Sequence, residues 1–463
     1  MKKVYKEVST LDKICYDSYN LSEDLLMEHA ALGIKNVLPK KSKSILIVAG
    51  QGNNGADGIA LARMLHLDKK VSLFMPFGAK SAMAKLQLKR ALSVGVKEID
   101  KIKSKYDVVV DCVFGSGLNN TLDDKTQNLI NKLNNLKALK IACDIPTGIT
   151  NEGKIENTAF IADITITMGA HKEALYSDKA KDFTGKIKCV DLGVSHKLYE
   201  RKCDTFLLEK KDMKLPHRKK RNSHKGDFGH LSVVVGKKQG AGIIAALSAY
   251  AFGAGLVTIV ENEPYAVPYS LMGSTTLPHN NTAVCIGMGL GNQFDDDCLR
   301  KFLLSHDNPM LLDADLFYRD ILVEVLDKKS NLVLTPHPKE FSSLLKMTKV
   351  ADISVNEIQE HRFKYIRLIS QKYPKVVIVL KGANTLIAQN GTVFIQNFGT
   401  NALSKGGSGD VLGGLIASLL AQNYDPLKAS ITGSLAHALS CKKFKKNSYA
   451  LTPDALIEGV KSL

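Results

Sequence analysis

The alternation of short apolar runs with helical patterns is the feature that most constrains the fold of this chain. The runs are rich in β-branched residues and almost continuous in apolar character, and the second half of the chain repeats the alternation of the first half. Such runs are typical of strands buried on both faces of a parallel sheet. The sequence therefore predicts two successive α/β units. The expected strands lie at 44–48, 71–74, 107–113, 140–143, 164–168, 187–190, 231–235, 256–260, 283–286, 310–312, 332–334 and 376–380, with a hairpin of 386–388 and 393–395 around Asn390-Gly391.

A basic stretch divides the two predicted units. Residues 210–225 hold eight Lys and Arg and one acid, Asp212, in a chain of 463 residues with a net charge of +17. At about 150 residues per domain, this length suits two or three domains. We expect the boundary at residue 205, with domains at 1–205 and 206–463. Apolar residues make up 44% and charged residues 24% of the chain, which excludes general disorder.

The positive charge admits nucleic acid, an anionic membrane surface or small anionic ligands as partners. Aromatic residues make up only 6% of the chain, Trp is absent, and no aromatic RNA-binding signature occurs. Most of the excess charge lies in 210–225 and in the lysines at 442–446. We therefore expect no nucleic acid partner. The charge is attributed to a basic connector, a Lys-rich surface and the steering of small phosphates.

The uncharged segment at 239–260 is long enough to span a bilayer. Gly253 and Gly255 interrupt it, so we predict a buried helix at 241–252, a glycine turn and a strand at 256–260, with no membrane span. The N-terminus lacks the apolar core of a signal peptide. The eight cysteines form no C-x-x-C pair, which favours buried free thiols in a protein of the reducing cytoplasm.

A glycine-rich turn follows the first long apolar run. Residues 51–58 read Gln-Gly-Asn-Asn-Gly-Ala-Asp-Gly and precede a helical pattern. Such a turn presents backbone N–H groups at the positive end of a helix, where phosphate binds. A plain tight turn would explain the glycines alone. The three short polar side chains Asn53, Asn54 and Asp57 crowd a turn that needs at most one of them, and this density favours a ligand site.

Two further strand ends carry an acid. Asp111 lies in Val-Val-Asp-Cys-Val-Phe-Gly-Ser-Gly, and Asp144 lies in Ala-Cys-Asp-Ile-Pro-Thr-Gly. The ligand crevice of an open α/β sheet lies outside the carboxyl ends of its strands, so Asn54, Thr147 and both acids are expected to converge there. Either Asp alone could be a cap or turn residue. Together with the Asn-rich loop they indicate a site, and a donor set of oxygen atoms suits a hard cation.

A second glycine-rich block lies in the other half, at 399–410, directly before an apolar helical pattern. It contains two adjacent glycines, a Ser-Gly step and Asp410 at the expected helix start. The turn predicts an anion hole, and Asp410 would accept the proton of a hydroxyl that attacks a phosphoryl group. A helix cap is the alternative, but capping does not require four glycines. Lys381–Thr385, Gly287–Gly291 and His337, which lies between two prolines, end other strands of this half.

These motifs resemble those of bifunctional NAD(P)H-hydrate repair enzymes. The motifs at 50–58, 110–118 and 144–148 are similar to the signatures of NAD(P)H-hydrate epimerases, over about residues 1–205. The resemblance to nucleotide-dependent NAD(P)H-hydrate dehydratases of the ribokinase-like fold covers about residues 206–463. Its motifs lie at 224–229, 287–291, 335–338, 381–385 and 406–412. The resemblance implies a Rossmann-like three-layer α/β/α domain followed by a ribokinase-like α/β domain.

The resemblance also implies the activities. The first domain would interconvert the R and S hydrates of NADH and NADPH, and the second would dehydrate the S form at the expense of ADP or ATP. Phosphorylation of the hydroxyl would turn it into a good leaving group. The implied ligands are the hydrates, an adenine nucleotide, K⁺ at the epimerase site and Mg²⁺, and we expect a cytoplasmic homo-oligomer. The alternative is that the second domain is a ribokinase-like kinase of a small hydroxyl substrate.

By the same resemblance, Asp144 is the expected acid or base of the epimerase and Asp410 the base of the dehydratase. K⁺ would be held by Asn54, Asp111 and Thr147. The implied contacts to the epimerase substrate are Asn53, Asn54, Gly55, Ala56, Asp57, Gly115, Ser116, Gly117, Leu118, Asn119, Asn120, Thr121 and Asp144. Those to the dehydratase substrate are Ala241, Gly289, Gly291, His337 and Asp410, and those to the nucleotide are Lys381, Gly382, Ala383, Asn384, Thr385 and Gly409.

Overall fold

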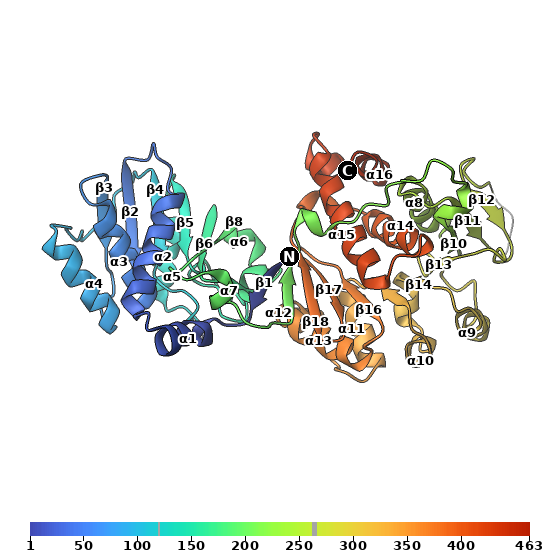
Figure 1. Ribbon diagram of the computed structural model, residues 1–463, viewed down its shortest axis with the longest axis horizontal. Coiled ribbons are helices and arrows are strands. Elements are labelled where there is room, and N and C mark those ends of the chain that lie inside the picture. The colour runs from blue at the N-terminus through green and yellow to red at the C-terminus, as the bar shows by residue number, and fades with distance from the viewer. Residues whose placement is uncertain (119–120, 262–265) are drawn as a thin grey trace. The chain divides into compact units, whose positions relative to one another are not determined.

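The computed structural model describes residues 1–118, 121–261 and 266–463 (Figure 1). It divides into two compact units. The first unit is Lys3–Cys203, and the second unit is Asp204–Leu463 together with Met1 and Lys2. Each unit consists of helices packed on a mainly parallel sheet, so the predicted α/β fold class is confirmed.

The first unit contains six parallel strands in the order β3-β2-β4-β5-β6-β8. Every strand predicted for this half is present, and no end moves by more than one residue. The chain leaves β2 toward β3 and then crosses back to β4, so the order reverses between β2 and β4, where open α/β sheets bind their ligands. The strands are β2 (Ser44–Ala49), β3 (Lys70–Phe74), β4 (Val108–Cys112), β5 (Leu139–Cys143), β6 (Ile164–Met168) and β8 (Lys186–Val190).

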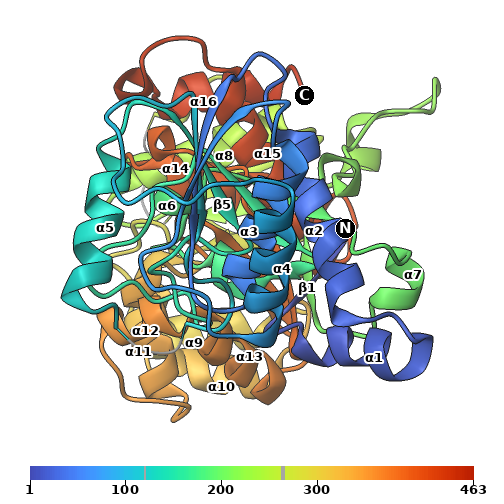
Figure 2. The same ribbon diagram turned by 90° about the vertical axis from the view of Figure 1, so that its left-hand side faces the viewer.

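The two faces of this sheet are covered by different helices, because successive side chains of a strand point to opposite faces. Ile45 and Ile47 of β2 pack with α2, α3 and α4, whereas Leu46 and Val48 pack with α5. Figure 2 shows α5 on one side of these strands and α3 and α4 on the other. The result is the three-layer arrangement that was expected. The helices are α1 (Ser9–Tyr19), α2 (Glu23–Val37), α3 (Asn53–Leu65), α4 (Ala82–Ser93), α5 (Asp124–Asn134), α6 (Lys181–Thr184) and α7 (His196–Tyr199).

A short parallel strand pair completes the first unit. The strand β7 (His171–Lys172) follows β6 closely along the chain and pairs with β1 (Lys2–Tyr5). Val4 lies opposite His171, and Tyr5 lies opposite Lys172. The pairing fixes the backbone at Lys172, a residue of the pocket described below.

The second unit is built on strands in the order β12-β11-β10-β13-β14-β15-β16-β17-β18-β9. Strands β10 to β16 run parallel, so their carboxyl ends share one edge. The hairpin β17–β18 follows β16, and its turn at Asn390 and Gly391 has φ values of 48° and 78°, as a two-residue turn requires. The strands are β9 (Thr205–Leu207), β10 (His230–Val234), β11 (Leu256–Val260), β12 (Met272–Ser274), β13 (Ala283–Ile286), β14 (Met310–Leu312), β15 (Leu332–Leu334), β16 (Val377–Leu380), β17 (Thr385–Gln389) and β18 (Thr392–Gln396).

The uncharged segment at 239–260 forms a helix and a strand, as predicted. It comprises α8 and β11, and the buried face of α8 packs with α14 and α16. Among the described residues, no helix combines the length and apolar character that crossing a membrane requires. The helices are α8 (Gln239–Ala251), α9 (Asp296–Ser305), α10 (Ile321–Lys328), α11 (Pro338–Met347), α12 (Val355–Glu360), α13 (Arg362–Lys372), α14 (Ser408–Ala421), α15 (Pro426–Lys443) and α16 (Pro453–Val460).

All eight cysteines are free thiols. The predicted burial is confirmed for five of them and is wrong for Cys298. Cys298 is exposed because it lies on the solvent side of α9, a helix that buries Leu299 and Leu303 instead. The buried thiols are Cys15, Cys112, Cys143, Cys285 and Cys441, and Cys189 and Cys203 are partly exposed.

Candidate active sites

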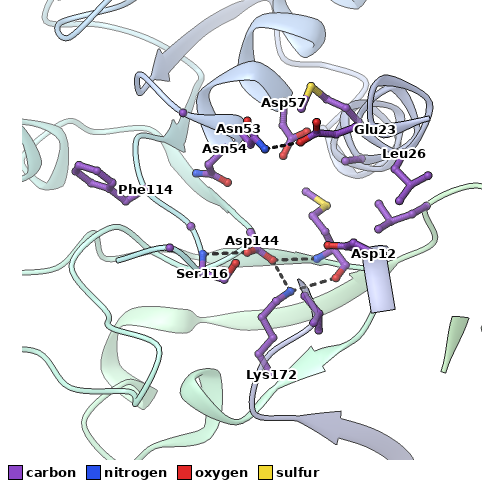
Figure 3. A pocket seen from close by; sticks show the side chains of 18 of the residues that line it. Asp12, Glu23, Leu26, Asn53, Asn54, Asp57, Phe114, Ser116, Asp144 and Lys172 are labelled. Atoms are coloured by element: carbon purple, nitrogen blue, oxygen red, sulfur yellow. Dashed lines mark hydrogen bonds and ion pairs between the residues drawn. The ribbon is translucent and has the colours of Figure 1, made fainter. Parts of the chain in front are cut away.

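The first candidate site is a pocket of about 430 Å³ in the first unit, at the carboxyl ends of its strands (Figure 3). It lies where the strand order reverses, as expected for an open α/β sheet. Its lining includes Asp12, Tyr16, Glu23, Leu26, Gln51, Gly52, Asn53, Asn54, Asp57, Phe114, Gly115, Ser116, Gly117, Asp144, Met168 and Lys172.

The glycine-rich turn places the N-terminus of α3 at this pocket. Gly52 is the N-cap residue, and no side chain of the described residues caps the helix, so the first N–H groups of α3 are available to an anionic ligand. A Cβ atom on Gly55 would lie 1.9 Å from the carbonyl oxygen of Gly50, which requires glycine there. The side chain of Asn53 donates a hydrogen bond of 2.6 Å to Glu23 of α2, across the mouth of the turn.

Asp144 sits directly after β5 and points into the pocket (Figure 3). Its backbone has a φ of 64°, in the left-handed region that non-glycine residues rarely adopt. Its Oδ1 accepts a hydrogen bond of 2.6 Å from Lys172 Nζ and one of 3.2 Å from the Met168 N–H. Its Oδ2 accepts a bond of 3.2 Å from the N–H of Ser116, in the loop after β4. These bonds hold the carboxylate in one orientation.

The pocket holds two carboxyl groups, Asp144 and Asp57, whose pKa values are shifted in opposite directions. Burial by itself raises the pKa of Asp144, but the Lys172 ammonium and the N–H donors outweigh it and hold that pKa below its usual value. Burial, with the nearby negative charges of Asp144 and Asp12, raises the pKa of Asp57 well above its usual value. Two carboxyl groups whose pKa values are pushed apart can serve as base and acid in one site.

Of the three residues expected to hold a cation, Asn54 lines this pocket, and Asp111 and Thr147 are buried outside its lining. Thr147 donates to Asp111 through its N–H and its hydroxyl, both at 2.8 Å, and burial raises the pKa of Asp111 to about 6. Asn54 lies against Gly115, since a Cβ on Gly115 would lie 2.9 Å from Asn54 Oδ1. The buried Nδ2 of Asn54 has no hydrogen-bond partner among the described residues. The carboxylate, hydroxyl and amide oxygens fit a hard cation of low charge.

Not all expected contacts line this pocket. Ala56 is fully buried beneath it, and Leu118 packs into the core on the other face of the sheet. Thr121 belongs to a separate, very small cavity with Gly148 and Thr150. Asn119 and Asn120 lie outside the described residues.

The sequence analysis did not identify Lys172, Asp12 or Glu23 as site residues. Lys172 follows the carboxyl end of β6 by a few residues, so the rule that selected Asp111 and Asp144 would have reached it. Asp12 and Glu23 come from the helices α1 and α2, and no local pattern marks a helical acid as part of a distant pocket.

The second candidate site lies at the carboxyl ends of β14 to β16 in the second unit. Lys381, directly after β16, binds Asp313, directly after β14, at 2.9 and 3.3 Å. The same ammonium lies 3.7 Å from Glu340 of α11. A Cβ on Gly409 would lie 3.7 Å from Lys381 Nζ, so the first turn of α14, which also carries Asp410, reaches this lysine.

Asp410 has the electrostatic properties of a general base. Burial and the charge of Asp313 raise its pKa to about 6, although Lys381 opposes the shift. Burial raises the pKa of Glu340 to about 7. A carboxyl group with a pKa of about 6 is ionised at neutral pH and is a stronger base than an ordinary Asp. The N-cap of α14, Gly407, has a φ of 83°, which only glycine adopts readily.

His337 is half exposed and caps α11. Its Nδ1 accepts hydrogen bonds of 3.1 and 3.2 Å from the backbone N–H groups of Lys339 and Glu340. The backbone N–H of His337 donates a bond of 2.7 Å to the carboxylate of Glu340. Burial and the charge of Lys381 lower the pKa of His337, so the imidazole is neutral at physiological pH. The cap orients the ring, and its Nε2 lies 3.2 Å from Glu340 Oε1.

The remaining expected residues of this site fall into two groups. Ala241 lies in the first turn of α8, and a Cβ on Gly289 would lie 2.4 Å from the carbonyl oxygen of Lys238, beside that helix. Gly291 donates its N–H to Asp315 at 2.8 Å. In the loop after β16, Gly382 and Ala383 are exposed, Thr385 begins β17, and Asn384 is buried with its carbonyl bonded to Arg362. The sequence analysis did not select Asp313 or Glu340.

Comparison with known proteins links the two units to two families. A family model described as YjeF-related protein N-terminus matches residues 23–174, and one described as NAD(P)H-hydrate dehydratase matches residues 231–461. A structure of ADP/ATP-dependent NAD(P)H-hydrate dehydratase from Bacillus subtilis, co-crystallised with ATP and Mg²⁺, is 29% identical, with a TM-score of 0.45. The match covers 54% of this chain and 92% of that one.

Two full-length relatives carry the same description. The bifunctional NAD(P)H-hydrate repair enzyme Nnr of Helicobacter pylori is 45% identical, over 100% of both chains. That of Coxiella burnetii is 31% identical, over 95% of this chain and 93% of the relative. The similarity runs through both units and both candidate sites, and the chain belongs to the family of bifunctional NAD(P)H-hydrate repair enzymes.

Proposed function

We propose that the first unit epimerises the R and S hydrates of NADH and NADPH, and that the second unit dehydrates the S form at the expense of ADP or ATP. The observation that carries this proposal is the 45% identity to the Helicobacter pylori repair enzyme across both units. Each unit also holds an aspartate, Asp144 or Asp410, with a buried or partly buried lysine nearby. The two activities together give the dehydratase access to both epimers.

In the first unit, the hydrated nicotinamide ring would lie between Asp144 and Asp57. The ionised Asp144 would accept a proton and the protonated Asp57 would donate one. The open N-terminus of α3 would bind a phosphate of the nucleotide. The acid-base groups and the anion site line the same pocket, as a substrate with a neutral ring and a charged tail requires.

In the second unit, the hydroxyl of the S hydrate would attack the terminal phosphorus of the nucleotide while Asp410 takes the hydroxyl proton. The new phosphorus–oxygen bond replaces the bond to the departing nucleotide. Phosphate then leaves with the electrons of the carbon–oxygen bond, and loss of a proton from the adjacent ring carbon restores the double bond. Hydroxide alone is a poor leaving group, which explains the need for a nucleotide.

The nucleotide would lie along Lys381, Gly382, Ala383, Asn384, Thr385 and Gly409. Bound Mg²⁺ would neutralise charge on the transferred phosphoryl group. Lys381 already binds the carboxylates of Asp313 and Glu340, and the described residues contain no group of three or more His, Cys, Asp or Glu side chains that could hold a metal ion. We therefore propose that the phosphates supply most of the Mg²⁺ ligands, as is usual for this ion.

The proposed function is tested by adding the purified chain to a mixture of R and S hydrates with ADP or ATP. Complete return of the reduced-nicotinamide absorbance is expected, since the first unit feeds the R form to the second. A stable phosphorylated product without return of absorbance would instead identify a kinase of a small hydroxyl substrate. Conversion that stops when the S form is exhausted would remove the epimerase from the proposal.

We propose that K⁺ occupies the position beside Asn54, Asp111 and Thr147. There it would hold the loop after β4, whose Ser116 N–H binds Asp144. Replacing K⁺ by a bulky organic cation should therefore slow epimerisation and leave dehydration of the S form unchanged. Asn54→Ala should raise the K⁺ concentration for half-maximal epimerisation roughly 10- to 100-fold, as is typical when support for a metal site is lost. Equal epimerisation rates in both cations would contradict K⁺ binding.

The dehydratase should lose activity as the pH falls through about 6. Asp410 must be ionised to take a proton, and burial with Asp313 raises its pKa to about 6, so the active fraction falls below that pH. The measurement is the pH profile of kcat/KM for the S hydrate, in which this loss of activity appears as the acid limb. Asp313→Asn removes one cause of the shift and should move the limb to lower pH. A limb that stays in place in this variant would assign it to another group.

The remaining expectations on partners and location stay predictions. We propose a cytoplasmic homo-oligomer that acts on small nucleotides and binds no nucleic acid. We attribute the charge of the basic stretch, whose residues 217–227 are mostly exposed and lie on the approach to β10 of the second unit, to the steering of these anionic nucleotides.

A further inference from the structure

The side chain of Lys172 is buried in a way that is unusual for a lysine. Only 2% of it is exposed, yet it reaches the pocket of the first unit. Its ammonium donates to Asp144 Oδ1 at 2.6 Å, to Thr167 Oγ1 at 2.9 Å and to the carbonyl oxygen of Met168 at 3.1 Å. Three acceptors satisfy its three N–H groups, and the pairing of β7 with β1 holds its backbone.

Asp144 depends on this single positive charge. Its other hydrogen-bond donors are the neutral N–H groups of Met168 and Ser116 and the hydroxyl of Thr167. Among the described residues, Lys172 is the one cation that contacts it. The titratable groups near Asp144 on the neighbouring elements are Asp57 of α3, Asp12 of α1, Tyr199 of α7 and Cys143 of β5.

None of those neighbours could replace the lysine. Asp57 and Asp12 carry carboxyl groups, which supply no positive charge in either protonation state, and the tyrosine and the thiol are neutral at physiological pH. A buried carboxyl group without a cation takes up a proton rather than remain charged. Lys172 itself has no further donor to offer a substrate, because all three are bonded inside the protein.

We propose that Lys172 is the positioning residue of the epimerase site, which fixes Asp144 in orientation and keeps it as the carboxylate that takes and returns the proton. This inference rests on the proposed function and adds a residue to it. The inference predicts that removal of the lysine makes the epimerisation rate depend on pH in a range where the wild-type rate is constant. Without the lysine, burial would raise the pKa of Asp144, and the carboxylate would be lost as the pH falls.

The experiment uses the full-length chain with Lys172→Met, Lys172→Arg and Lys85→Met. The last removes an exposed lysine of α4 and matches the loss of one charge. Conversion of the R to the S hydrate without nucleotide, followed by chromatographic separation, reports epimerisation, and turnover of the S hydrate with ADP or ATP reports the second unit alone. At about pH 6, we expect Lys172→Met to turn over the R hydrate at least roughly tenfold more slowly than the wild type and to recover toward pH 8, since each unit of pKa changes the ionised fraction tenfold. Lys172→Arg should be less affected.

The controls separate this inference from the proposed function. Lys85→Met should behave as the wild type, and S-hydrate turnover should be the same in every variant. A Lys172→Met chain with the wild-type kcat and pH profile for the R hydrate would overturn the inference. Absence of R-hydrate turnover in the wild type would instead overturn the proposed function of the first unit.

A second measurement covers the case in which Lys172→Met unfolds the first unit. The thermal unfolding of Lys172→Met, Asp144→Asn and the double variant forms a double-mutant cycle. If the lysine serves to neutralise Asp144, the double variant should be more stable than Lys172→Met, because no unpaired buried charge remains. If Lys172→Met and the double variant unfold at the same temperature, the lysine only fills space and the inference fails.

Discussion

Replacement of Asp410 by Asn is expected to slow dehydration of the S hydrate roughly 100- to 10,000-fold, the usual contribution of a general base. Asn has nearly the same shape, so the first turn of α14 is preserved, but its amide cannot accept the hydroxyl proton. The measurement is the initial rate at which reduced-nicotinamide absorbance returns from the purified S hydrate with ADP or ATP.

Two controls accompany this variant. Epimerisation, followed by chromatographic separation of the two hydrates, should be unchanged, because it takes place in the other unit. Asp425→Asn is the matched substitution: Asp425 caps α15 through the N–H groups of Leu427 and Lys428, and Asn caps a helix about as well. A dehydration rate of Asp410→Asn close to that of the wild type would show that another group takes the proton.

Replacement of Asp144 by Asn is the second change with a large expected effect. Epimerisation should slow roughly 100- to 10,000-fold, because the amide cannot take a proton and cannot pair with the charge of Lys172. Dehydration of the S form should be unaffected. With an R and S mixture, the absorbance should therefore rise until the S form is exhausted and then stop.

The matched control for this change is Asp123→Asn, at the N-cap of α5. Its carboxylate accepts the N–H of Thr126 at 2.8 Å, and Asn can accept the same bond. This variant should convert the whole mixture. Complete conversion by Asp144→Asn at the wild-type rate would be incompatible with an acid-base role of Asp144.

The long apolar strands could be predicted from the sequence because both faces of each are buried. Runs such as Ser44–Ala49 and Val377–Leu380 are apolar on both faces and end at glycine or polar residues. The short strands β1, β7 and β12 could not be predicted. They are two to four residues long and contain polar residues such as His171 and Lys172, so their pairing depends on tertiary contacts.

Candidate site residues could be predicted where they lie at the end of a buried strand or in a glycine-rich turn, although Asp313, directly after β14, was not selected. Asp111, Asp144 and Lys381 were found in this way. Glu340 and Asp12 were not, because each lies on a helix and reaches its site only after the chain has folded. The raised pKa of Asp57 could not be predicted from the sequence either, since it depends on burial and on the spatial proximity of Asp144.

The left-handed backbone at Asp144 limits how the first site can be lost by mutation. With a φ of 64°, most L-residues would strain the chain there by roughly 1–2 kcal/mol, whereas Asn and Gly tolerate this conformation. Asn is one nucleotide change away from Asp and would keep the loop intact. If Asp144 is the acid-base residue that we propose, one nucleotide change could therefore remove the epimerase without straining this loop, although the Lys172 ammonium would lose its carboxylate partner. The residue at this position is the one to inspect when a relative is credited with both activities.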